Sequence, residues 1–172
     1  DYQNPEIVVG SVVAHGGQVL LCRRAIEPRR GFWTLPAGYL EFGETPQEGA
    51  RREAREEAEA DIALDGVLAL YSISRLGQVQ VLFRARFAVS PHFAAGPESL
   101  EVALFAWDEI PWTEIAFPTV RWALEAWRAN PLGPLGAPAG NPPGSVSRCW
   151  PYCSRRRRGT ATTCWMARCR IW

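Results

Sequence analysis

The sequence has no lysine, only two histidines, and a single cysteine before residue 148. Because Cys22 is alone in the body of the chain, disulfide bonds cannot be what holds the fold together. His15 lies beside two glycines and His92 follows a proline in a loop-like stretch. No second His or Cys lies near either one, so we expect turn or loop positions rather than metal ligands or bases.

Long apolar runs are also absent. No stretch approaches the roughly 20 apolar residues of a membrane-spanning helix, which argues against a membrane protein. The first ten residues, DYQNPEIVVG, lack the basic start and apolar middle of a secretory signal. The expected location is therefore the cytoplasm.

Acidic residues stop at Glu125, and this divides the chain. Up to Asn130 there are 12 Arg against 18 Asp and Glu, a net charge of −6, whereas the remainder has seven Arg and no acid. The net charge of +1 for the whole chain hides this split. Since an acidic surface repels phosphate backbones, we expect no nucleic-acid partner for residues 1–130.

Composition predicts three parts. Residues 1–130 form the domain, the Pro/Gly-rich residues 131–147 form a flexible linker, and residues 148–172 form a basic tail expected to be disordered. Three hypotheses stay open for the tail: an arm for nucleic acid or membrane surfaces through its four consecutive arginines, a metal site, or an accidental extension such as a shifted reading frame. The metal site would use the tail cysteines Cys149, Cys153, Cys164 and Cys169.

Apolar patterns predict both strands and helices within the domain. Residues 7–24 contain two β-branched runs separated by His15-Gly16-Gly17, which indicates a hairpin. Further strands are predicted at residues 32–35, 66–74, 79–89 and 101–107, and an amphipathic helix at residues 117–129.

The rest of the chain is organised around residues 38–60, GYLEFGETPQEGARREAREEAEA. Glu53, Glu56 and Glu57 have the spacing i, i+3 and i+4, which brings them to one side of a helix. Like charges at this spacing repel each other at a cost of about a few tenths of a kcal/mol per pair. A bound divalent metal ion would remove that cost, so this stretch predicts a metal site.

The start of this helix is well defined by its sequence. Thr45 as N-cap, Pro46 at the first helical position and Glu48 three residues after the cap form a capping box. Alanines at positions 50, 54 and 58 form a separate stripe of small side chains. We expect that stripe to pack closely against a sheet as part of the core.

The same stretch resembles the Nudix signature. The pattern runs Gly38, five residues, Glu44, seven residues and then REAREEAEA from Arg52, so that every charged position of the 23-residue signature is present. A solvent-exposed charged helix is the alternative, which the letters REAREEAEA alone would allow. The resemblance implies an α+β fold, an α/β/α sandwich with a mixed β-sheet between helices.

The chain departs from the signature at the end of the helix. Glu59 stands where the family has glycine, and Ala54 and Ala60 are smaller than the usual aliphatic residues. The glycine supplies a left-handed residue, a conformation that costs glutamate on the order of 1 kcal/mol. This departure bears on the helix end and not on the metal site.

The resemblance also implies roles for individual residues. Glu53, Glu56 and Glu57 are expected to bind Mg²⁺ or Mn²⁺ together with the backbone carbonyl of Ala37. Supporting roles are implied for Gly38, Glu44 and Arg52, with Arg52 keeping the carboxylates ionised and aimed.

The general base remains open among several carboxylates. Family members use a carboxylate from the helix, here Glu53 or Glu57, or one from a loop, where Glu98 and Glu101 lie in this chain. Both loop residues are candidates for the base or for a further metal ligand.

Outside the signature the chain is similar to a Nudix subgroup that often carries an N-terminal zinc ribbon and includes ADP-ribose and FAD pyrophosphatases. The similarity rests on the stretches YQNPEIVVG, LLCRRAIEPRRGFWTLPAGYLEFGE, FAAGPESLE and LFAWDEIPW. The chain opens where the ribbon would end, so no zinc is expected there. The implied reaction is Mg²⁺- or Mn²⁺-dependent hydrolysis of a nucleoside diphosphate linked to another moiety, ADP-ribose or FAD, with release of AMP.

Two other functions stay open. A house-cleaning nucleoside triphosphate pyrophosphatase would use the same site, and a non-catalytic nucleotide sensor would normally lose a carboxylate that is present here. Arg23, Arg24, Phe32 and Glu101 are candidates for substrate binding, with a solvated loop and packing into the sheet as the alternatives for the arginines and Phe32. Many relatives are homodimers, so a homodimer is a further expectation.

Overall fold

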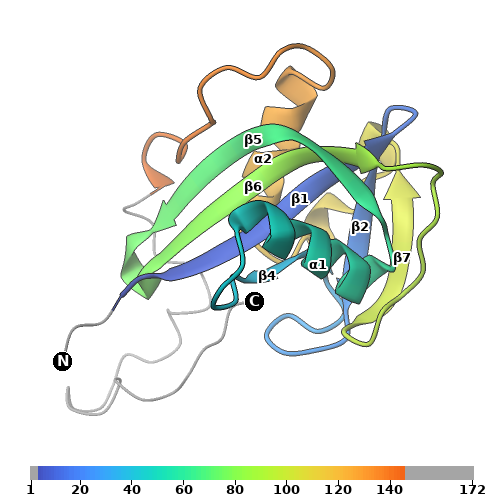
Figure 1. The fold of residues 1–172 in the computed structure, drawn as a ribbon, viewed down its shortest axis with the longest axis horizontal. Coiled ribbons are helices and arrows are strands. Elements are labelled where there is room, and N and C mark those ends of the chain that lie inside the picture. Colours follow the sequence, from blue (N-terminus) through green and yellow to red (C-terminus); the bar gives the residue numbers. More distant parts are fainter. Residues whose placement is uncertain (1–3, 146–172) are drawn as a thin grey trace.

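A mixed sheet forms the centre of the protein in this computed structural model, which describes residues 4–145 (Figure 1). The strands are β1 (Glu6–His15), β2 (Gln18–Arg24), β3 (Trp33–Thr34), β4 (Ala37–Tyr39), β5 (Ile62–Ile73), β6 (Gln78–Phe87) and β7 (Ser99–Phe105). The helices are α1 (Pro46–Ala58), α2 (Pro118–Ala129) and the short 3₁₀ turns η1 (Ser74–Leu76), η2 (Trp107–Glu109) and η3 (Trp112–Glu114).

The strand order is β3-β2-β1-β6-β5, with β4 paired to β1 and β7 paired to β2. The β1–β6 pair is parallel, and the other strand pairs of the sheet are antiparallel. The predicted hairpin joins β1 to β2 through Gly16 and Gly17, whose φ angles of +56° and +81° suit a tight turn. The mixed sheet predicted from the sequence is therefore confirmed.

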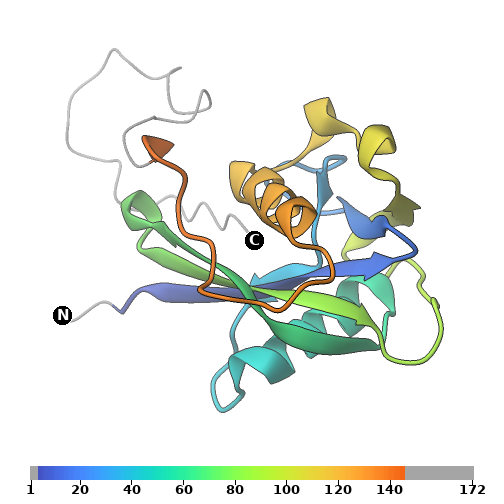
Figure 2. The same cartoon turned by 90° about the horizontal axis from the view of Figure 1, so that it is seen from above.

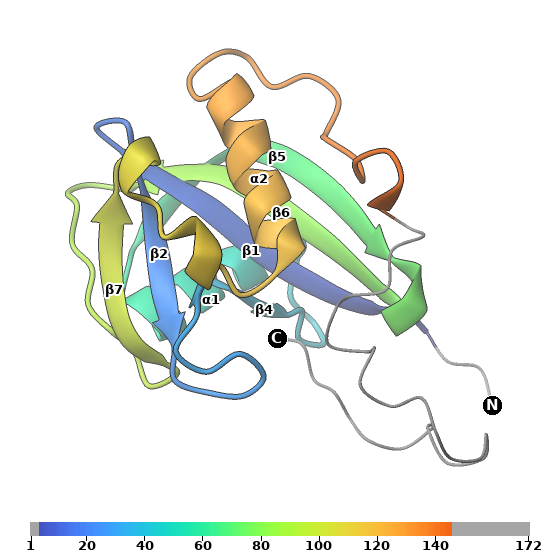
Figure 3. The same ribbon diagram turned by 180° about the vertical axis from the view of Figure 1, so that it is seen from behind.

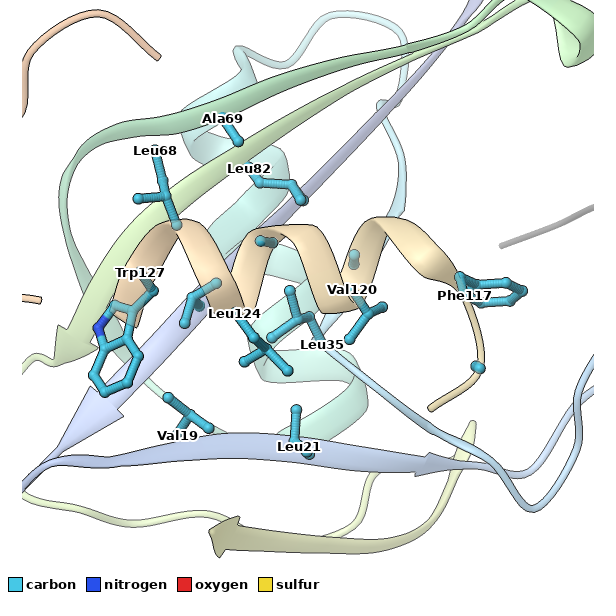
Figure 4. Close-up of a cluster of buried hydrophobic side chains, with 14 of the residues drawn as sticks. Val19, Leu21, Leu35, Leu68, Ala69, Leu82, Phe117, Val120, Leu124 and Trp127 are labelled. Carbon is cyan, nitrogen blue, oxygen red and sulfur yellow. The ribbon is translucent and has the colours of Figure 1, made fainter. Parts of the chain in front are cut away.

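The two long helices cover opposite faces of the sheet. Figure 2 shows α1 on one side and α2 on the other, and Figure 3 shows α2 lying across the strands. On the α2 face, Leu124 and Trp127 are buried with Leu21 and Leu35 in a large apolar cluster (Figure 4). On the α1 face, Ala54 and Ala58 of the alanine stripe are buried, as predicted. The structure is the expected α/β/α sandwich.

Strand β5 begins four residues earlier than the sequence predicted. The apolar pattern starts at Gly66, but the strand runs through Gly66, which has a φ angle of +152°. The register with β6 shifts between Leu64 and Gly66, which is the mark of a β-bulge. A glycine inside a strand pattern signalled this bulge and not a strand end.

The chain after α2 does not leave the domain. Ala139 pairs with Ala69 of β5. The Ala139 N–H donates to the Leu68 carbonyl, and the Leu70 N–H donates to the Ala139 carbonyl, both at 2.9 Å. The side chain of Asn141 donates to the carbonyl of Ser72 and accepts from its N–H, at 2.9 and 2.8 Å. In Figures 1 and 3 this segment follows the edge of the sheet along β5.

These contacts differ from the flexible linker that the Pro/Gly content of residues 131–147 indicated. Arg84 adds to them, because its Nη1 donates to the carbonyls of Asn130 and Gly133 at 3.0 and 2.8 Å. The three-part division of the chain stays a prediction, and the basic tail lies outside the described residues. Within residues 4–145, no helix is both long and apolar enough to cross a membrane.

Candidate active site

Helix α1 begins as its sequence indicates, and it ends at Ala58 although Glu59 departs from the signature. Thr45 and Glu48 form the capping box, with the Glu48 N–H donating to Thr45 Oγ1 and the Thr45 N–H donating to Glu48 Oε2. Glu59 adopts the left-handed conformation, φ +48° and ψ +27°, that the family fills with glycine. Its N–H donates to the Arg55 carbonyl at 3.0 Å, so a backbone hydrogen bond closes the helix end despite the substitution.

The three signature glutamates do not share one environment. Glu53 and Glu57 face the sheet and are 8 % and 6 % exposed, whereas the Glu56 side chain is 57 % exposed. Glu57 Oε2 accepts a hydrogen bond from the N–H of Ala37 in β4 at 3.0 Å. The resemblance implied that the Ala37 carbonyl is a metal ligand, which stays a prediction; the structure shows the Ala37 N–H orienting the Glu57 carboxylate.

Gly38 lies directly against the Glu53 carboxylate. A Cβ atom at Gly38 would come within 2.5 Å of the Glu53 carboxyl carbon and even closer to one of its oxygens. Any side chain at residue 38 would therefore displace the Glu53 carboxylate. The glycine is required for space on the α1 face of β4.

Arg52 links the loop before α1 to the carboxylates of the helix. Its Nε and Nη2 donate to both oxygens of Glu44 at 3.1 and 2.7 Å, and Nη2 also donates to the carbonyl of Tyr39 at 3.0 Å. Its Nη1 donates to Glu53 at 2.6 Å and to Glu56 at 3.0 Å. The hydrogen bond from Arg52 lowers the pKa of Glu44, which is consequently ionised at neutral pH.

Burial sets the protonation of the two inward-facing glutamates. It raises the pKa of Glu57 to about 8 and that of Glu53 to about 7, against an ordinary value of 4.5. Hydrogen bonds from Ala37 and Arg52 oppose this effect but do not overcome it. Two buried carboxyls that resist ionisation would be ionised more readily beside a cation.

The signature glutamates are ligands of the type that a hard divalent cation prefers, but they are not arranged as a complete coordination site. Within residues 4–145, no three or more His, Cys, Asp or Glu side chains are grouped so that they could hold a metal ion. Arg52 engages Glu53 and Glu56 instead. Carboxylate oxygens are nevertheless the donors that Mg²⁺ and Mn²⁺ prefer, and Glu53 lies in a cradle that a Cβ at Gly38 would fill.

Two further predicted residues lie within electrostatic reach of this pair. Glu98 is exposed in the loop before β7, and after burial its charge contributes to the raised pKa of both Glu53 and Glu57. Arg24, at the end of β2, is 2 % exposed and donates from Nε to the Pro28 carbonyl at 2.8 Å. Burial lowers the pKa of Arg24, while the charges of Glu57 and Glu98 act to raise it.

Arg24 also has unused hydrogen-bonding capacity. In the described part of the chain, its Nη2 is buried without a hydrogen-bond partner, and its guanidinium lies 5.2 Å from the centre of the Phe117 ring. A buried, unpaired donor on a cation is costly, and an anionic ligand would satisfy it.

The other predicted substrate residues lie at the same end of β2. Arg23 faces Glu101 across the β2–β7 pair, and their charged groups are 3.6 Å apart. Both side chains are about half exposed, and Arg23 Nε also donates to the Gly31 carbonyl. Phe32 is half-buried, with the Arg29 guanidinium 5.0 Å from its ring centre. Their place in the site rests on their nearness in sequence and in strand pairing to Arg24.

Sequence reasoning missed two residues beside the glutamates. Cys22 is buried on the α1 face, where burial and then the charge of Glu57 raise the pKa of its thiol. Gly96 is buried, and its N–H donates to the Glu57 carbonyl at 3.1 Å. The strand alternation of β2 could have placed Cys22 on this face, but no local signal brings Gly96 to the end of α1.

Known proteins of one family are similar to this chain. The family model described as NUDIX domain matches residues 4–123. A solved NUDIX hydrolase from Nitrosomonas europaea is 46% identical, with a TM-score of 0.72, over 75% of this chain and 73% of that chain. An ADP-ribose pyrophosphatase from Methanocaldococcus jannaschii is 26% identical over 113 residues, 64% of this chain and 67% of that protein.

A MutT-like protein from Streptomyces ambofaciens is 38% identical over 79 residues, 46% of this chain. The matched part spans about half, 49%, of that relative's length. The family model covers most of the chain and includes α1, β4 and every residue proposed for the site from Arg23 to Glu101. The chain belongs to the Nudix family of hydrolases.

Proposed function

We propose that this protein hydrolyses a nucleoside diphosphate linked to another moiety, with ADP-ribose or FAD as the candidate substrates and AMP as one product. The observation that carries the proposal is the pair of buried carboxyls, Glu53 and Glu57, held against Ala37 and Gly38 of β4. Burying two acids lowers the stability of the fold, so a structural role does not explain them. Catalysis on a bound diphosphate would explain why they are buried.

The proposed metal ligands are Glu53, Glu56 and Glu57, with the Ala37 carbonyl and Glu98 as further candidates. When bound, Mg²⁺ or Mn²⁺ would neutralise the diphosphate and lower the pKa of a coordinated water. Arg52 keeps Glu53 aimed by its 2.6 Å contact, and Glu44 fixes Arg52 through both carboxylate oxygens.

The bond changes are simple. A water oxygen bonds to one phosphorus, and the bridging P–O bond breaks, so that each product carries one phosphate. A carboxylate, for which Glu53, Glu57 and Glu98 are the candidates, accepts the proton of the attacking water. ADP-ribose would yield AMP and ribose 5-phosphate, and FAD would yield AMP and FMN.

Arg24 and its neighbours provide the proposed contacts to substrate. The buried, unpaired Nη2 of Arg24 supports a role in binding a phosphate oxygen. Arg23 and Glu101 lie next along the same strand pair, and Phe32 offers an aromatic face. The similarity to an ADP-ribose pyrophosphatase supports the substrate class.

A nucleoside triphosphate pyrophosphatase is the second candidate, because the MutT-like relative is 38% identical over 79 residues. The test is a substrate panel of ADP-ribose, FAD, dinucleoside polyphosphates and nucleoside triphosphates, each with Mg²⁺ and with Mn²⁺. Products are separated by chromatography, and ³¹P NMR identifies the cleaved bond. Release of AMP from ADP-ribose or FAD is the expected result; turnover of triphosphates alone would reject it in favour of the second candidate.

A further inference from the structure

The C-terminal end of α1 is closed by a loop that is distant in sequence. The last carbonyls of a helix have no N–H partner within the helix and need donors from elsewhere. Here the Ala94 N–H donates to the Ala58 carbonyl at 2.9 Å, and the Gly96 N–H donates to the Glu57 carbonyl at 3.1 Å. Residues 94–96 therefore supply two donors to the turn of α1 that carries Glu57.

Gly96 makes the closest approach in this junction. A Cβ atom at Gly96 would overlap the carbonyl oxygen of Glu56 and lie 2.7 Å from its carbonyl carbon. These are backbone atoms inside a helix, so they cannot move aside as a flexible side chain would. Gly96 does not have a positive φ angle, and the reason for glycine here is space alone.

The segment that follows Gly96 is tied down at both ends. The Ser99 N–H donates to the Gly96 carbonyl at 3.1 Å, and the Ala25 N–H donates to the Glu98 carbonyl at 2.8 Å. Ser99 then begins β7 and pairs with Arg24. Between these anchors lies Glu98, whose charge acts on Glu53, Glu57 and Arg24.

We propose that Gly96 is a positioning residue that fixes the Glu98 carboxylate relative to Glu53 and Glu57. The close contact of Gly96 with the Glu56 carbonyl sets how far the loop stands from α1, and Glu98 follows two residues later. This proposal rests on the proposed function of the same site. In this proposal Gly96 acts through Glu98 and not by a contact of its own with substrate or metal.

The test is a double-mutant cycle on Gly96→Ala and Glu98→Gln. The added methyl group must push the loop from α1, and misplacing a reacting group by about 1 Å can cost on the order of 10²-fold in rate. We expect each single variant to lower kcat, with the KM of the best panel substrate changed much less. In the double variant, Gly96→Ala should add no loss to that of Glu98→Gln. Losses that multiply would show that Gly96 does not act through Glu98.

Gly136→Ala is the matched control, because Gly136 is exposed and nothing lies within 4 Å of its added Cβ. Amide hydrogen exchange gives a readout that needs neither metal nor turnover. In Gly96→Ala, protection of the residue 94 and 96 amides should fall at least about tenfold, while the middle of α1 keeps its protection. Unchanged protection would overturn the proposal, whereas an intact junction on a wild-type protein that hydrolyses no panel substrate would instead reject the proposed function.

Discussion

The two faces of the sheet are covered by side chains of different chemical character. On the α2 face, long apolar side chains such as Leu124, Val120 and Trp127 fill the space between helix and strands. On the α1 face, alanines bring the helix close to the sheet, and Glu53 and Glu57 are buried beside them. One face gains stability from apolar burial, and the other gives up some of it to bury acids.

This contrast separates folding from chemistry. Because Glu53 and Glu57 are harder to ionise than in water, the α1 face depends on the α2 face for the stability of the whole domain. Substitutions on the α1 face should therefore change activity more than stability, and those on the α2 face should do the reverse. Four predictions test this division.

The largest effect is expected at Glu57. Glu57→Gln keeps the shape of the side chain but removes the negative charge, and we expect kcat to fall by about 10²- to 10⁴-fold. The free energy of unfolding should stay the same or rise, because a neutral amide costs less to bury. Steady-state kinetics and urea denaturation measure the two quantities. Glu59→Gln is the control, since Glu59 is exposed at the end of the same helix; equal activity of both variants would contradict the assignment.

On the opposite face, Leu124→Ala should act on stability. Leu124 is fully buried in the α2 cluster, and the truncation should lower the free energy of unfolding by about 2–5 kcal/mol. Below the unfolding temperature, kcat should stay within about twofold of wild type because the α1 face is untouched. Leu132→Ala removes the same atoms from a side chain that is 92% exposed and should have little effect on either quantity. A large loss of kcat in Leu124→Ala would break the division between the faces.

The raised pKa values predict a pH dependence that only the α1 face produces. Folding raises the pKa of Glu57 from 4.5 to about 8, so the folded protein holds an extra proton between these values. The metal-free protein should therefore lose stability as pH rises through this window and level off above it. Urea denaturation in EDTA at several pH values measures the slope. Glu57→Gln should reduce the slope and leave the part that Glu53 contributes, since the pKa of Glu53 is raised to about 7. Leu124→Ala should leave the slope unchanged; a stability that rises with pH would reject the burial effect.

The smallest effect is expected at the edge of the sheet. Asn141→Ala removes two hydrogen bonds to the Ser72 backbone, at 2.8 and 2.9 Å, from an exposed position. The free energy of unfolding should fall by about 1 kcal/mol, with kcat unchanged. Additivity with Glu57→Gln would be expected for independent sites. Unchanged unfolding would mean that the two Asn141 hydrogen bonds contribute nothing to the stability of the domain.

The sequence predicted what depends on local pattern. The capping box at Thr45, the glycine hairpin and the alanine stripe all follow from residues a few positions apart, and each is present in the structure. The resemblance implied that Arg52 aims the carboxylates, but it could not say which oxygens Arg52 engages, because pairing among several acids depends on their burial.

Long-range contacts explain the remaining differences. Ala139 and Asn141 complete the edge of β5, about 70 residues before them in the chain, and a Pro/Gly-rich composition carries no sign of that partner. Gly96 meets the end of α1 in the same way. Both contacts form because the strand edge and the helix end have backbone groups that need hydrogen-bond partners. The order of residues in the sequence does not show which distant segment supplies those partners.

The parallel pairing of β1 with β6 also bears on how the chain acquires its structure. Glu6 lies opposite Gln78 and Ala14 opposite Arg86, so the middle of the sheet joins strands about 70 residues apart and is expected to form slowly. During synthesis, β1 emerges before β6, and until β6 is made the valines of β1 lack the strand that covers them. β4 is attached to β1, and it holds Ala37 and Gly38. A nascent chain stopped before β6 would therefore contain the entire signature but lack the parallel partner of the strand to which β4 is attached.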